Sequence, residues 1–202
     1  RDWSSDVCSS DLASEAGIVA GLMDPGMALA DCVRIALVEF DRLAAFSTDP
    51  RREKERGAIP GIVEQGLIAL RPYGIPSAIQ GKIVHNFHSL PVPILGYYDL
   101  IYHDLGMIID IKTSLRLASE ISDDHARQVS FYLHNTALEG RVAYITPQKH
   151  AVYRVENPVA GMNELLNIAH RMMRTLSVSD DPKEIAAMMV PDLSSFYYSD
   201  DA

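Results

Sequence analysis

The stretch LGYYDLIYHDLGMIIDIKTS, residues 95–114, constrains the fold more than any other part of the chain. Two apolar segments flank the polar break HDLG, which predicts two antiparallel strands joined by a tight turn. Asp99, Asp110 and Lys112 interrupt the apolar pattern. A charge in a buried strand costs several kcal/mol unless it is paired or bound to an ion. The hairpin therefore needs a chemical reason for carrying three of them.

The length of the turn fixes how these charges meet. A loop of two residues (104–105) or of four (103–106) gives the same register, in which Asp99 is opposite Asp110, whereas a three-residue loop would break it. Lys112 shares a face with Asp110 because side chains alternate along a strand. Two carboxylates and an ammonium on one patch predict a site for a hard divalent cation. An ordinary solvated strand face is the alternative.

Composition narrows the class of protein. The chain has 202 residues, 48% hydrophobic and 22% charged, which suits one soluble domain with a sizeable core. No apolar run approaches the roughly 20 residues that span a bilayer and no secretory leader is visible, so we expect a cytoplasmic protein with no membrane partner. Cys8 and Cys32 are too few for an iron–sulfur cluster. No G-x-x-x-x-G-K-[ST] motif is present, so we expect no ATP.

The acidic balance bears on nucleic acid as a partner. A net charge of −9 argues against it at first, since Lys and Arg supply most phosphate contacts. Net charge is not local charge, and RREKERG, residues 51–57, is rich in basic residues. The sequence favours a solvated helix end or loop for this run, with a phosphate contact as the alternative.

The first twelve residues differ from the rest of the chain. RDWSSDVCSSDL has no periodicity and no initiator Met, and it closely resembles translated sequencing-adapter read-through. We therefore expect an artefactual leader at 1–12, a missing true N-terminus, and a single domain over 13–202.

The order of predicted elements is that of an α/β domain. Ser122 is the expected N-cap of the helix over 119–140, and Gly140 its expected stop. The helix over 59–74 is expected to start near Pro60. Periodicity predicts helices over 13–22, 27–46, 59–74, 119–140, 159–177 and 181–189. Strands are predicted over 78–88, 94–103, 107–113, 141–147 and 150–156.

The helix that follows the three-strand meander carries a polar row. His125, Gln128 and Tyr132 are three and four residues apart, so they lie along one helix face. Gln128 and Tyr132 are equally explained as a satisfied polar pair at a helix–sheet boundary.

Taken in this order, the features resemble the PD-(D/E)XK nuclease superfamily and, within it, the RecB-like branch that includes phage and recombination exonucleases. The matching pieces are GYYD (96–99), IIDIKTS (108–114) and QVSFY (128–132), and the resemblance covers roughly residues 13–155. It implies a restriction-endonuclease-like αβββαβ core, in which a central mixed sheet is flanked by helices.

The resemblance also implies roles for the charged residues. Asp99 and Asp110 would bind one or two Mg²⁺ or Mn²⁺ ions, and the backbone carbonyl of Ile111 could complete the shell. Lys112 would orient the attacking water or stabilise the charge that develops on the phosphate.

Further residues are implied in supporting roles. Gln128 and Tyr132, with His125 and Thr113 beside them, would support the site and contact DNA.

Relatives of this kind also carry an acidic or histidine residue on an early helix. Glu15 matches that position best, and Glu64 is the rival.

The expected function is a Mg²⁺-dependent deoxyribonuclease, most simply an exonuclease of phage or bacterial recombination or repair. Two alternatives stay open: a nuclease-like domain with endonuclease or RNA activity, and a catalytically silent relative that binds nucleic acid or has a structural role. Intact Asp99, Asp110 and Lys112 argue against the silent relative. An oligomer is compatible with the sequence.

Overall fold

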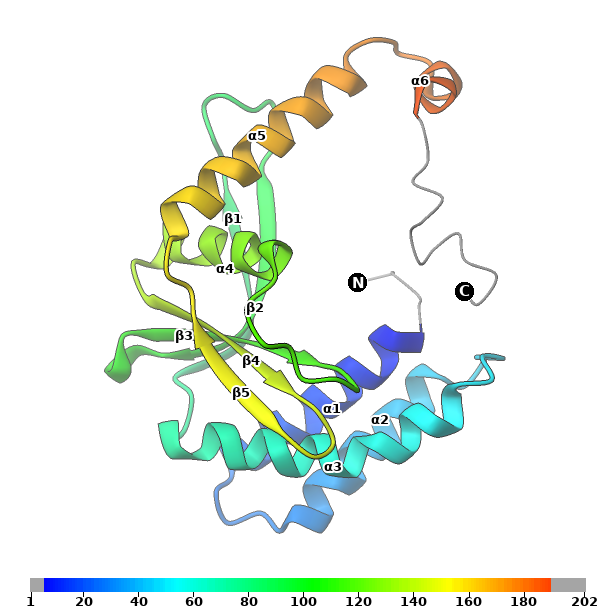
Figure 1. Ribbon diagram of the computed structural model, residues 1–202, viewed down its shortest axis with the longest axis vertical. Coiled ribbons are helices and arrows are strands. Elements are labelled where there is room, and N and C mark those ends of the chain that lie inside the picture. The colour runs from blue at the N-terminus through cyan, green and yellow to red at the C-terminus, as the bar shows by residue number, and fades with distance from the viewer. Residues whose placement is uncertain (1–5, 190–202) are drawn as a thin grey trace.

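A five-stranded mixed sheet forms the centre of the protein, as the computed structural model, which describes residues 6–189, shows (Figure 1). Its order follows the chain, and every neighbouring pair is antiparallel except β3 with β4. That pair is parallel because the chain crosses over through α4 between the two strands. The strands are β1 (Ala78–His85), β2 (Ile94–Tyr102), β3 (Met107–Thr113), β4 (Glu139–Ile145) and β5 (His150–Arg154).

Helices cover both faces of the sheet, which makes the fold class α/β, as the sequence predicted. The first three helices are α1 (Asp6–Met23), α2 (Leu29–Leu43) and α3 (Arg52–Leu70), and they bury one core against the sheet. On the opposite face α4 (Asp123–Thr136) buries a second core, with α5 (Pro158–Leu176) packed on it. The short α6 (Pro182–Met188) follows α5 (Figure 1). Within residues 6–189 no helix has the length and apolar character to cross a membrane.

Alternation along β3 assigns its side chains to the two cores. Ile109 and Ile111 belong to the core under α1, α2 and α3, whereas Ile108 belongs to the core under α4. Asp110 and Lys112 therefore extend from the face that α4 covers.

Two helices begin earlier than the sequence predicted. α1 starts at Asp6, so residues 6–12, which we expected to lie outside the domain, form its first turns. The adapter resemblance of this segment stays a prediction. α3 starts at Arg52, and Pro60 lies inside the helix. Glu53 and Glu55 in the first turn favour this earlier start because acidic side chains complement the helix dipole.

The end of α4 corrects a second expectation. Ser122 is the N-cap as predicted, and its hydroxyl accepts the His125 N–H. Gly140 is not the stop. The helix ends at Thr136, and Ala137 adopts the left-handed conformation with φ of 55°. Gly140 lies in β4, where an added Cβ would be 2.6 Å from Val129 Cγ1, so its glycine serves close packing of α4 on the sheet.

Gly96 in β2 allows a similar close approach of α4 to a second strand. A Cβ at this position would lie 2.8 Å from Cε1 of Tyr132 and 3.2 Å from the Phe131 ring, and both rings are buried. We expect Gly96→Ala to lower the free energy of unfolding by about 1–3 kcal/mol, the usual cost of overpacking. Gly57→Ala is the matched control, since a Cβ there has no neighbour within 4 Å. In its exposed helix it should stabilise by about 0.5–1 kcal/mol. Urea denaturation measures both, and a neutral Gly96→Ala would contradict the packing argument.

Candidate metal centre

The β2–β3 turn sets the register of the site. It has four residues, a 3₁₀ turn over His103–Leu105 followed by Gly106 with φ of 60°. Leu100 pairs with Ile109, and continuing this register places Asp99 opposite Asp110, as the sequence predicted.

Asp99 occupies the point where β2 separates from β3. The paired rungs end at Leu100 and Ile109, and beyond them a side chain of β2 accepts a hydrogen bond from the backbone of β3. The Ile111 N–H donates to Oδ2 of Asp99 at 2.7 Å, so the carboxylate takes the place of a strand partner. With 5% of its surface exposed, Asp99 is fixed inside the sheet.

Lys112 and Asp110 form a buried ion pair. Nζ of Lys112 lies 2.8 Å from Oδ2 of Asp110, whose side chain is 2% exposed. Burial by itself lowers the pKa of Lys112, but the charge and hydrogen bond of Asp110, together with the charge of Asp99, raise that pKa above its ordinary value. The ammonium is therefore present at neutral pH.

Negative charge is in excess at the carboxylates. Burial raises the pKa of Asp99 well above its ordinary value of 3.8, and the charges of Asp110 and Glu15 raise it further. The Ile111 N–H and the Lys112 ammonium act in the opposite direction without cancelling this effect. An added cation would relieve the repulsion.

The helix acid beside these carboxylates is Glu15, not Glu64. Glu15 is 7% exposed, acts electrostatically on Asp99, and accepts a hydrogen bond of 2.8 Å from Nε2 of Gln80. Glu64 is exposed on α3, where it lines a surface hollow beside Leu67. The structure thus places the acid from α1 at the site, which was the preferred of the two sequence alternatives.

Gln128 and Tyr132 support the site from α4. Nε2 of Gln128 donates to the Tyr132 hydroxyl at 2.7 Å, and that hydroxyl donates to the Tyr97 carbonyl at 2.6 Å. The pair thereby ties α4 to β2, two residues before Asp99. Tyr132 is 1% exposed, so a DNA contact, which the family resemblance implied, does not fit its position in this structure.

A hollow of about 770 Å³ opens beside Lys112. His125 and Tyr144 line it, joined by a 2.7 Å hydrogen bond, and exposed Arg116 lies on its rim. Burial and the Lys112 charge lower the pKa of His125, which keeps the imidazole neutral. Sequence reasoning missed Arg116 and Tyr144. Tyr144 pairs with Lys112 across the parallel β3–β4 ladder, which no local pattern indicates.

Thr113 lines the same hollow, but its polar groups are engaged. Both its N–H and its hydroxyl donate to Oδ1 of Asp11, at 3.1 and 2.7 Å.

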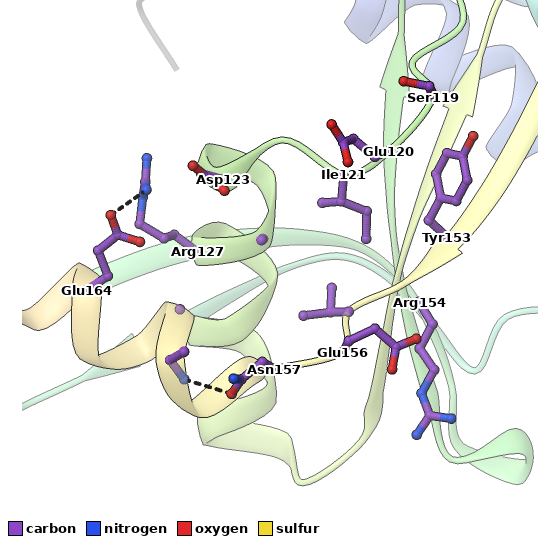
Figure 2. Close-up of a pocket in the computed structure, with 14 residues that line it drawn as sticks. Ser119, Glu120, Ile121, Asp123, Arg127, Tyr153, Arg154, Glu156, Asn157 and Glu164 are labelled. Carbon is purple, nitrogen blue, oxygen red and sulfur yellow. Dashed lines mark hydrogen bonds and ion pairs between the residues drawn. The ribbon is translucent and has the colours of Figure 1, made fainter.

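Two other features lie apart from the carboxylates. A hollow of about 530 Å³ lies between α4, β5 and α5, and its lining does not include Asp99, Asp110 or Lys112. Figure 2 shows its lining side chains, among them the ion pair of Arg127 with Glu164. In the basic run, Arg51 and Arg56 lie within 2.8 Å of Asp49 and Asp41. The run forms the start of α3, where two of its basic residues are paired with acids, and this agrees with the helix end that the sequence favoured.

Comparisons with known proteins add little. No family model matches the chain, and no curated protein matches it. A solved structure described as the crystal structure of SSO0001 is similar, with 17% sequence identity and a TM-score of 0.47, over 89% of this chain and 84% of that chain. A likeness this distant assigns neither a family nor a function.

The oxygen donors and their negative charges suit a hard cation, but they do not form a complete coordination shell. Carboxylate and carbonyl oxygens are the ligands that Mg²⁺ and Mn²⁺ prefer, and Asp99, Asp110 and Glu15 supply three carboxylates. Within the described residues, however, no group of three or more His, Cys, Asp or Glu side chains is arranged to hold a metal ion. Asp110 is engaged by Lys112, and Glu15 by Gln80.

The raised pKa of Asp99 gives a test of this charge excess. Below its ordinary pKa, Asp99 is neutral in the folded and unfolded states; as the pH rises through the raised folded-state pKa, the folded protein must carry a buried charge and loses stability. In EDTA near pH 8, Asp99→Asn should raise Tm by about 2–4 °C, the shift for about 1 kcal/mol in a chain of this size. Near pH 4 the difference should vanish. Thermal melts at both pH values measure it, and a destabilised variant at high pH would contradict it.

Proposed function

We propose that this protein is a metal-dependent DNA nuclease with a restriction-endonuclease-like core, and that it acts in the cytoplasm as an exonuclease. One observation carries the proposal: buried Asp99 and Asp110 and partly buried Lys112 meet on two central strands, with Glu15 of α1 acting on Asp99. Charges that repel in a folded core are retained where a ligand uses them.

The residues have separate roles in phosphodiester hydrolysis. Asp99, Asp110 and Glu15 would hold Mg²⁺ or Mn²⁺, with the Ile111 carbonyl as a further ligand. When bound, such an ion lowers the pKa of its water and shields the phosphate charge. Lys112 places an ammonium where negative charge develops on the phosphate in the transition state. The aspartates are held in position by the sheet, and Lys112 by its ion pair.

The hollow beside Lys112 supports a phosphate-bearing substrate. Lys112 and Arg116 provide cations on one part of its lining, although Asp11, Glu120 and Asp123 line the same hollow and the net charge of the whole chain is −9. His125 contributes a neutral imidazole and Tyr144 a hydroxyl, which can bond phosphate oxygens without adding charge. The DNA backbone would therefore approach along α4 and the end of β3.

A second candidate function is a catalytically silent relative that binds nucleic acid or has a structural role. The observation that favours it is the ion pair of Lys112 with Asp110, because the ammonium occupies a carboxylate that a metal would need.

Metal titration together with a degradation assay separates these functions. Mn²⁺ and Mg²⁺ are titrated into the protein by calorimetry, and end-labelled linear DNA, circular DNA and RNA are incubated with each metal or with EDTA. An exonuclease binds metal and degrades linear DNA only with metal present, leaving circles intact. Cleavage of circular DNA or of RNA would replace the exonuclease assignment. Protein that neither binds metal nor cuts any substrate would establish the silent relative.

A further inference from the structure

β1 is broken at Gln80, directly across from Asp99. The β1–β2 ladder pairs Ile79 with Leu100 and Gly81 with Tyr98, but the rung between them is missing. Continuing the register places Gln80 opposite Asp99. Gln80 has a φ of 48°, in the left-handed region that a non-glycine residue seldom adopts inside a strand.

Both strands change face at this rung. Ile79 packs with the core under α1, α2 and α3, whereas Ile83 packs with the core under α4, although residues four apart in a regular strand share a face. Leu100 and Tyr98 of β2 divide between the two cores in the same way. The break therefore turns the outer part of the hairpin toward α4 (Figure 1). The register of both ladders places Asp99 at the point of turning.

The side chain of Gln80 connects this break to the helix acid. Its Nε2 donates to Oε1 of Glu15 at 2.8 Å, which holds a nearly buried carboxylate close enough to raise the pKa of Asp99. Gln80 itself is exposed, so burial of its side chain in the core does not explain the strained backbone. Strain of this kind persists where the surrounding structure uses the conformation, and it gathers at functional sites.

We propose that Gln80 is a positioning residue that orients Glu15 toward Asp99 and thereby sets the affinity of the site for a divalent cation. The inference rests on the proposed metal site and adds a residue to it that is not a ligand. Partners that orient metal ligands typically change metal affinity by about 10–100-fold when removed.

Two glycine substitutions at positive φ form a matched pair for the test. Gln80→Gly removes the amide and relieves the backbone, and Ala137→Gly relieves a second non-glycine residue with positive φ, at the exposed end of α4. Calorimetric Mn²⁺ titration should give a Kd about 10–100-fold weaker for Gln80→Gly and unchanged for Ala137→Gly. Melts in EDTA should keep both variants within about 4 °C of wild type, since each substitution relieves the backbone strain of a single residue.

A double-mutant cycle shows whether Gln80 acts through Glu15. Glu15→Gln alone should weaken Mn²⁺ binding, and adding Gln80→Gly to it should cause no further loss. The inference is overturned, while the metal site stands, if the losses of Mn²⁺ binding free energy in the two single variants simply add in the double variant. The same holds if Gln80→Gly binds Mn²⁺ as tightly as wild type. A Gln80→Gly variant that melts far below wild type in EDTA yet binds Mn²⁺ normally identifies a structural role instead. Wild-type protein that binds no Mn²⁺ overturns the metal site and this inference together.

Discussion

Asp110→Asn is expected to abolish metal-dependent DNA cleavage and to weaken Mn²⁺ binding. Asp110 is 2% exposed and accepts a hydrogen bond from the Lys112 ammonium, so it is the carboxylate that the proposed metal would share with Lys112. Asparagine keeps the size of the side chain and an oxygen acceptor, but it removes the negative charge that a hard divalent ion requires. In this variant Lys112 loses its nearest negative charge and keeps only more distant ones. This loss is the only destabilisation that we expect.

Asp104→Asn is the matched control for this prediction. It makes the same chemical change on the same hairpin, in the exposed β2–β3 turn. Calorimetric Mn²⁺ titration and single-turnover cleavage of linear DNA should leave Asp104→Asn at the wild-type values, and circular dichroism should show both variants folded. Folded Asp110→Asn that cuts DNA at the wild-type rate would remove Asp110 from the site.

The geometry of the β2–β3 pair could be predicted from sequence because everything that fixes it is local. The polar break sets the turn, Gly106 supplies its left-handed residue, and strand alternation then decides which side chains meet. The N-cap at Ser122 is local in the same sense, since its hydroxyl bonds a backbone N–H three residues on.

The features that the sequence did not predict depend on contacts between distant segments. Gly140 follows a helical pattern and therefore suggested a helix stop, but its lack of a Cβ is required by Val129 and Leu133 of α4. In AIQGKIVH, residues 78–85, the glycine next to Gln80 is the residue that would be expected to take a positive φ. Nothing local shows that Gln80 takes it instead, and the side-chain partner of Gln80 is Glu15, on a helix far earlier in the chain.

Lys112→Ala should separate metal binding from catalysis. The ammonium lies 2.8 Å from Asp110, so it opposes any cation that approaches this carboxylate; its removal should leave the Mn²⁺ Kd unchanged or tighter. Cleavage should slow by about 10²–10³-fold, the usual loss for one preorganised electrostatic group. In EDTA the variant should melt below wild type, because Asp110 and Asp99 then repel without a neutralising charge, and Mn²⁺ should restore the loss.

Lys82→Ala, exposed on β1, controls for loss of a lysine elsewhere on the sheet and should change none of these quantities. Weaker Mn²⁺ binding by Lys112→Ala would mean that Lys112 holds the carboxylates in place for the ion. Wild-type cleavage by the same variant would instead mean that its charge does not act on the transition state. Lys112 contacts a carboxylate that the proposed metal would need, so its charge could either compete with the ion or assist the reaction. Measuring Mn²⁺ affinity, cleavage rate and metal-free stability on the same variant distinguishes these two effects.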